Sequence, residues 1–242
     1  MGDVKVQTGE AFEHFKNRVS NVKNKTVEAG AEALSNKVRN FNDAMETGRQ
    51  NVLVYKLKKE ENMLEYFVKV ADMPQEVIEK YKDQVPAELV QIWQEDGLGT
   101  FLDGYLKVIN PEDYIELLNE SYFDAKIAFP IFVTAFGDVI TWEKKAYVGI
   151  VKYNIQDCDI IIKSLKYFLK YLDDEYVYEN FDLDLYREAI AKYGQLAYDE
   201  CFGFVPLLAL GGFKDVAHLQ KVKVLEHIYL MYQLTGGVMD DW

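Results

Sequence analysis

Residues 126–154 read KIAFPIFVTAFGDVITWEKKAYVGIVKYN, and they carry the clearest secondary-structure signal in the chain. Three short runs rich in Ile, Val, Phe, Thr and Trp favour β-strands. They are separated by Phe136-Gly137-Asp138 and by Glu143-Lys144-Lys145, which are typical of turns between strands. Apolar residues at alternate positions predict a sheet with one buried face and one solvated face. We therefore predict three antiparallel strands within this stretch.

Helical patterns lie on both sides of the predicted strands. Pro86 and Asn110-Pro111 are good helix starts, because a first-turn proline and an asparagine cap suit the unpaired N–H groups there. We expect a strand or hairpin arm at 101–110 and an apolar turn or strand at 203–212. Helices are predicted at residues 73–84, 85–97, 110–122 and 156–172, in the second half of 173–200, and at 218–236. The expected fold class is α+β, a small antiparallel sheet packed with helices.

The first 62 residues differ in kind from the rest. They contain 11 Lys or Arg and 9 Asp or Glu, a net charge of +2 that leaves −15 on residues 63–242. Apolar residues recur at a spacing of three or four between residues 12 and 45, which predicts a long N-terminal helical extension. The polar composition leaves a partly disordered extension open as the alternative.

The composition excludes several classes of protein. Apolar residues make up 49% of the chain, too many for wholesale disorder. The longest apolar run, residues 201–213, is too short for a membrane helix and is broken by glycine and proline. The polar N-terminus and the two cysteines argue against a secretory signal and a disulfide framework. A net charge of −13 disfavours direct nucleic-acid binding, and we expect a protein of the reducing cytoplasm.

The sequence contains no clear motif for catalysis or for a cofactor. His218 and His227 are nine residues apart, which does not match two zinc ligands on one helix. Cys158 and Cys201 are expected to be small core residues rather than nucleophiles. The glycines form no phosphate-binding pattern, and carboxylate pairs are too abundant for any one pair to indicate a glycosidase. We predict no catalytic residues, no metal ligands and no cofactor.

Acidic and aromatic residues occur together in residues 173–184, a composition typical of protein interfaces. A smaller acidic patch lies at residues 95–105. The residues predicted to bind a protein partner are Asp173, Asp174, Glu175, Tyr176, Tyr178, Asp182, Asp184, Glu95, Asp96 and Asp103. The alternative for both patches is an ordinary solvated loop whose aromatic side chains belong to the core.

Longer motifs resemble a known family. Residues 86–118, PAELVQIWQEDGLGTFLDGYLKVINPEDYIELL, and residues 128–143, AFPIFVTAFGDVITWE, resemble the GAD-like domain. Residues 193–212, YGQLAYDECFGFVPLLALGG, and residues 219–236, LQKVKVLEHIYLMYQLTG, resemble the C-terminal domain that accompanies it. The pair is similar to the immunity proteins of type VI secretion DNase effectors and related polymorphic toxin systems. The most specific pieces are GTFLDGYLKVINPEDY, AFGDVITWE and FGFVPLLALGG.

The resemblance implies a division of the chain into three parts. Residues 1–62 are the helical extension, which loosely resembles the helical linker of LXG-type toxins. Residues 63–155 correspond to a GAD-like α+β domain, and residues 156–242 to a mostly helical, immunity-type C-terminal domain.

The function that the resemblance implies is neutralisation of a cognate secreted toxin in the cytoplasm, by binding that occludes its active site. The expected toxin is a DNase. An acidic inhibitor suits the basic groove of a nuclease, because its carboxylates imitate the phosphate backbone. Two alternatives stay open, a small acidic enzyme or ligand-binding protein with a pocket near the sheet, and an adaptor that pairs its N-terminal helix with another helix.

Overall fold

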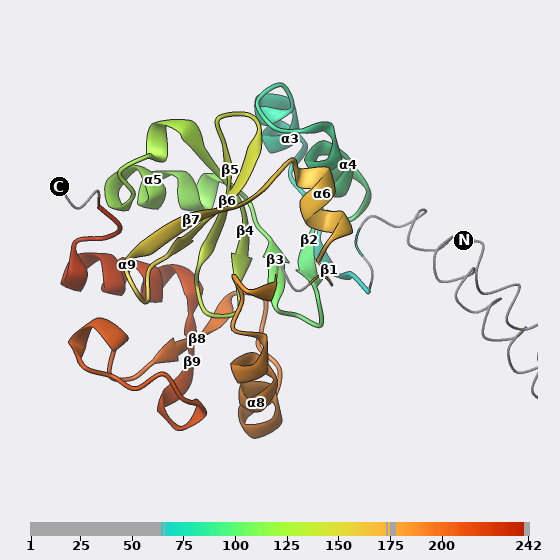
Figure 1. Cartoon of the computed structure of the whole chain (residues 1–242). Coiled ribbons are helices and arrows are strands. Elements are labelled where there is room, and N and C mark those ends of the chain that lie inside the picture. The colour runs from blue at the N-terminus through green and yellow to red at the C-terminus, as the bar shows by residue number, and fades with distance from the viewer. Residues whose placement is uncertain (1–63, 65, 173, 175–177, 240–242) are drawn as a thin grey trace, which may run out of the picture. The chain divides into compact units, whose positions relative to one another are not determined.

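The computed structural model describes residues 64, 66–172, 174 and 178–239 (Figure 1). The chain divides into two compact units, Met1–Glu61 and Asn62–Trp242, and every described residue belongs to the second. The predicted helical extension at residues 1–62 lies outside the described residues and stays a prediction. Among the described residues, no helix is both long enough and apolar enough to cross a bilayer.

The centre of the fold is a seven-stranded antiparallel sheet in which each strand pairs with its neighbours in sequence. Its strands are β1 (Val68–Ala71), β2 (Leu98–Phe101), β3 (Leu106–Val108), β4 (Ala128–Thr134), β5 (Val139–Glu143), β6 (Tyr147–Lys152) and β7 (Asp157–Lys163). A separate hairpin consists of β8 (Glu200–Phe204) and β9 (Leu219–Lys223). The three strands predicted in residues 126–154 are β4, β5 and β6. The α+β class is confirmed, with a wider sheet than predicted.

Helices cover both faces of the sheet (Figure 1). The helices α3 (Gln75–Tyr81), α4 (Ala87–Glu95) and α6 (Leu165–Lys170) pack on one face, and α5 (Glu112–Ser121) and α9 (Val224–Thr235) on the other. A further helix, α8 (Leu183–Tyr193), packs against the hairpin, where the rings of Tyr186 and Phe202 lie 6.3 Å apart. Short 3-10 helices occupy Ala125–Ile127, Leu208–Leu210 and Val216–His218.

The two layers of helices bury the middle strands on both sides. Phe132 and Ile140 belong to the core under α4 and α6, whereas Val133 and Val139 belong to the core under α5 and α9. Even Thr141 is fully buried. The prediction of a sheet with one solvated face was therefore wrong, because the apolar residues at both parities of these strands each find a helical layer to pack against.

The three helices predicted before β4 are confirmed. The start of α5 has the expected chemistry, since Asn110 Oδ1 accepts a hydrogen bond from the N–H of Glu112 at 3.1 Å. In α4 the apolar stripe is buried, with Trp93 and Leu89 almost fully covered. Capping and a continuous apolar stripe are local signals, so these helices could be found from the sequence.

Two predicted helices begin as strands instead. In the stretch 156–172 the chain forms β7 as far as Lys163, and only Leu165–Lys170 is helical. The three consecutive isoleucines at 160–162 favour extended backbone, and β6 pairs with them. The stretch 218–236 likewise begins with β9, which pairs with β8. In both cases a partner strand overrides a local pattern that also suits a helix.

The predicted boundary between residues 155 and 156 lies in the connection from β6 to β7, and these two strands are paired along their length. One sheet therefore contains strands from both predicted segments. The division into 63–155 and 156–242 stays a prediction.

A buried lysine fastens the sheet to the segment before β8. Lys107 in β3 is only 1% exposed, and its Nζ donates to the backbone carbonyls of Ala197, at 3.3 Å, and Glu200. Burial lowers the pKa of Lys107 to about 8, against the opposing effect of nearby Cys201 and Asp199. The charged ammonium is poorly solvated in this interior, so it loses its proton more easily than in water.

We predict that the contribution of Lys107 to the free energy of unfolding increases as the pH rises from about 8 to 10.5. In this window the unfolded chain still binds the proton that the folded chain has released, so unfolding becomes less favourable. The gain should reach about 2–3 kcal/mol. Urea unfolding between about pH 7 and 10 gives the free energy of unfolding of the wild type and of Lys107→Met. The difference between the two proteins isolates Lys107, because the effects of the other titrating groups cancel. A difference that does not change with pH would contradict the prediction.

Candidate functional site

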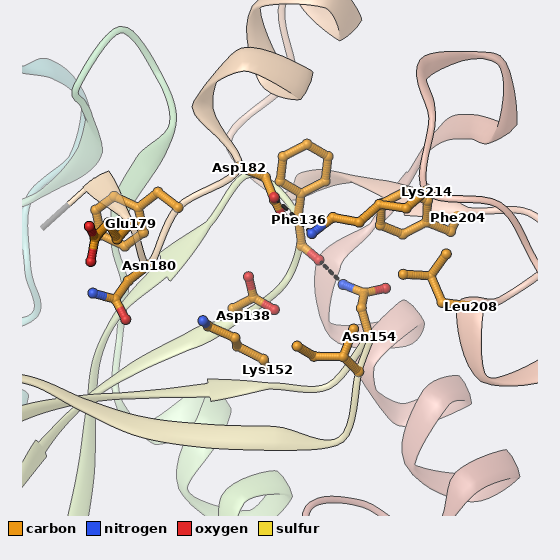
Figure 2. A pocket seen from close by; sticks show the side chains of 12 residues that line it. Phe136, Asp138, Lys152, Asn154, Glu179, Asn180, Asp182, Phe204, Leu208 and Lys214 are labelled. Carbon is orange, nitrogen blue, oxygen red and sulfur yellow. Dashed lines mark hydrogen bonds and ion pairs between the residues drawn. The ribbon is translucent and has the colours of Figure 1, made fainter. Parts of the chain in front are cut away.

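A polar pocket lies at one end of the sheet, where four segments meet (Figure 2). They are the turn after β4, the end of β6, the segment before α8 and the loop after β8. The pocket is small, with a volume of about 90 Å³. Its lining consists of Phe136, Asp138, Lys152, Asn154, Ile155, Glu179, Asn180, Phe181, Asp182, Phe204, Leu208 and Lys214. Both predicted segments, 63–155 and 156–242, therefore contribute to it.

A buried carboxylate forms part of the pocket wall. Asp138 is 7% exposed, and its Oδ2 accepts a hydrogen bond from Thr134 Oγ1 at 3.2 Å. The same hydroxyl oxygen accepts from the N–H groups of Phe136 and Asp138, so the turn holds its own side chain in place. Burial raises the pKa of Asp138 to about 6, although the hydrogen bond from Thr134 favours the charged form.

A second buried polar side chain lies nearby. Asn154 is 8% exposed, and its Nδ2 donates to the carbonyl oxygen of Phe136 at 2.8 Å, as Figure 2 shows. Its Oδ1 is buried and has no hydrogen-bond partner among the residues that the structure describes. Since an unpaired buried acceptor costs free energy, this oxygen favours the arrival of a donor from outside the chain.

The lining of the pocket combines three carboxylates with two lysines. Asp182 forms an ion pair with Lys214 at 2.8 Å, and its backbone N–H donates to Tyr105 Oη at 3.3 Å. Glu179 is a third carboxylate, so Asp138, Glu179 and Asp182 together face the two lysines of the lining. The pocket can therefore bind hydrogen-bond donors and basic groups.

The structure brings some of the predicted partner-binding residues to this site. Asp182 lines the pocket, and Asp184 is exposed in the first turn of α8, where Arg187 pairs with it at 2.7 Å. Asp103 is exposed, and its carbonyl oxygen accepts from Tyr186 Oη at 2.9 Å, which places the turn between β2 and β3 beside α8.

Other predicted residues are placed differently. Asp174 is exposed, whereas Tyr178 is half-buried against the core. Glu95 is exposed at the C-terminal end of α4, next to the half-buried Asp96, and neither lines the pocket. Asp173, Glu175 and Tyr176 lie outside the described residues.

Sequence reasoning did not identify Asp138 and Asn154 as site residues. Asp138 was assigned only to a turn, and Asn154 lies two residues after the end of β6. The one local signal is the spacing of Thr134 and Asp138, four residues apart across a glycine turn, which suits a side-chain hydrogen bond. Their burial depends on the hairpin of β8 and β9, which the local sequence does not reveal.

The remaining reactive side chains suit structural positions. Burial raises the pKa of the Cys201 thiol to about 12, which keeps it protonated and unreactive. Burial lowers the pKa of His227, and His218 pairs with Asp215 at 2.8 Å. In the part of the chain that the structure describes, no group of three or more His, Cys, Asp or Glu side chains is placed to hold a metal ion.

We predict that the stability of Asp138→Asn, relative to that of the wild type, increases from pH 4 to pH 7. Between the ordinary pKa of 3.8 and the folded value of about 6, the folded wild type retains a proton that the unfolded chain has lost. Stability of the wild type therefore falls as the pH rises through this window, by about 1–3 kcal/mol, whereas asparagine does not titrate. Urea unfolding at both pH values measures the change, and parallel curves would refute the assignment.

No protein of curated function matches the sequence. The crystal structure of Atu4351 from Agrobacterium tumefaciens has a similar fold, with a TM-score of 0.54 over 69% of this chain and 85% of that one. At 17% identity this likeness concerns the fold alone.

Two family models match the sequence. Residues 59–154 match the GAD-like domain, and residues 162–235 match the domain described as "T6SS immunity protein Tdi1, C-terminal". These are the two domains that the motifs resemble, in the expected order. The resemblance of these two regions to a GAD-like domain and to the C-terminal domain of a T6SS immunity protein is therefore confirmed.

Proposed function

We propose that this chain is an immunity protein that binds a cognate secreted toxin and occludes its active site. The observation that carries the proposal is the match of residues 162–235 to a type VI secretion immunity domain. That segment supplies Asp182, Phe204, Leu208 and Lys214 to the polar pocket, and the rest of the lining includes Phe136, Asp138, Lys152 and Asn154 from the GAD-like match. The chain would act by stoichiometric binding and needs no cofactor for it.

The charge of the chain favours a nuclease, and in this proposal a DNase, as the toxin. Residues 63–242 carry a net charge of −15, and three carboxylates lie at the pocket. A nuclease must present a basic surface to its substrate, so an acidic inhibitor is attracted to that surface over a long range. Since such a toxin attacks nucleic acid inside the cell, the inhibitor would act in the cytoplasm.

A second candidate function is binding of a small basic ligand in the pocket. The unpaired Oδ1 of Asn154 beside the buried carboxylate of Asp138 is the observation that favours it. A small molecule retained through purification, and lost in Asp138→Asn, would support this candidate in place of toxin binding.

Co-expression tests the proposal directly. The product of the gene adjacent to that of this chain, as the candidate toxin, is expressed in bacteria with and without the full chain, and survival and chromosomal DNA integrity are scored. Rescue with intact DNA, against degraded DNA without the chain, is the expected result. Death in both cultures would overturn the immunity function, and rescue from a toxin that leaves DNA intact would overturn only its DNase class.

We predict that reversing the acidic charges near the pocket slows binding to the toxin. The double variant Glu179→Lys and Asp184→Lys should lower the association rate about tenfold or more at low salt and weaken its salt dependence. The control is Glu116→Lys with Glu120→Lys, which makes the same change in net charge on the exposed side of α5. Stopped-flow association with an inactivated toxin measures both. Equal slowing of the two variants would show that only net charge matters.

A further inference from the structure

The apolar motif FGFVPLLALGG, residues 202–212, is divided between the core and the surface. Phe202 and Phe204 in β8 are almost fully buried. The chain then leaves the strand, and residues 205–218 form the loop that connects β8 to β9. Connections within hairpins are usually two to five residues long, and much longer ones are commonly functional. The loop therefore needs an explanation that hairpin formation does not provide.

Large apolar side chains are exposed in this loop. Leu210 is 59% exposed and Phe213 is 65% exposed, and Val205 at the base is also exposed. Burying either of the two larger side chains is worth about 1.5–3 kcal/mol, so the fold gains little from them where they are. In the sequence Leu210 lies two residues after Leu208, and Phe213 directly precedes Lys214. Since Leu208 and Lys214 line the polar pocket, the apolar tip formed by Leu210 and Phe213 adjoins it.

The loop is held in one shape by its own backbone. At the base, the N–H of Val205 donates to the carbonyl of His218 at 2.8 Å, and within the loop the N–H of Gly212 donates to the carbonyl of Leu207 at 3.0 Å. Gly212 approaches the carbonyl of Pro206 so closely that a Cβ atom would collide with it. Compact loops of this kind, closed at the base, are frequent sites of function.

Side chains fix the loop to its surroundings as well. Lys214 pairs with Asp182 at 2.8 Å, and Tyr193 Oη in α8 donates to the carbonyl of Val216 at 2.8 Å. The ring of His218, bonded to Asp215, lies 5.2 Å from the ring of Phe213. An exposed phenylalanine that is already held in place loses little conformational freedom on binding, which is the property of a good interface anchor.

We infer that Leu210 and Phe213 are the apolar anchors by which this chain holds its toxin, inserting into an apolar socket bordered by basic residues. The inference rests on the proposed function and names the part of the chain that engages the partner. The basic border follows from charge complementarity, because residues 63–242 carry a net charge of −15, which attracts a basic partner and repels a second acidic copy. A partner with this chemistry fits a nuclease domain better than a second copy of this acidic chain.

The full-length double variant Leu210→Ser with Phe213→Ser tests the inference. Its affinity for the inactivated toxin domain should fall at least about 100-fold, with a faster dissociation rate, because buried aromatic and aliphatic anchors dominate interface energies. The matched control is Leu230→Ser with Leu234→Ser on α9, which removes two exposed leucines of 47% and 53% exposure. The control should bind within about threefold of the wild type. Titration calorimetry gives the affinities, and thermal unfolding checks that both variants fold.

The outcomes separate the inference from the proposed function. If the wild type binds and protects while the loop variant binds equally well, the inference is overturned and the immunity function stands. If the wild type does not bind the toxin, both are overturned. Light scattering of the wild type and of the loop variant measures whether either protein forms a dimer. A dimer that dissociates in the loop variant would assign the tip to a second copy of this chain and would also overturn the inference.

Discussion

The packing of Phe136 against Phe202 and Phe204 is the contact on which the candidate site depends. The ring of Phe136 lies 6.3 Å from that of Phe202 and is stacked at 5.9 Å on that of Phe204, and the N–H of Phe202 donates to the carbonyl of Ala135 at 2.7 Å. This contact fastens the hairpin of β8 and β9 to the turn after β4. The turn carries Asp138 and the hairpin carries the loop, so one aromatic cluster positions both the pocket and the exposed tip.

The elements that could be predicted from the sequence are those whose signals are local. The strands β4 to β6 are marked by their composition and by two turns, and α4 and α5 by proline starts, a cap and an apolar stripe. The strands β7 and β9 were predicted as helices because isoleucine and valine at these spacings suit either state. Their state is decided by pairing with β6 and β8, and a single sequence does not show which segments will pair.

The candidate site was predicted in part for a similar reason. Acidic residues are easily recognised, and Asp182 does line the pocket, but in an acidic chain most carboxylates are simply solvated. What distinguishes Asp138 and Asn154 is burial in a pocket whose other lining residues, such as Asp182 and Phe204, lie far away in sequence. The resemblance to a family supplied the function, because it relates whole motifs to a known role and does not depend on knowing which side chains become buried.

The two halves of the candidate interface would contribute in different ways. Carboxylates around the pocket act at long range, so they speed the approach of a basic partner and disfavour an acidic one, yet exposed charges add little to the affinity itself. Leu210 and Phe213 act only on contact, but each removes apolar surface from water and slows dissociation. An inhibitor of a lethal enzyme needs both fast capture and a long-lived complex. The loop that carries the apolar anchors is joined to the carboxylates around the pocket by the ion pair of Lys214 with Asp182. A single surface could therefore provide both fast capture and slow dissociation.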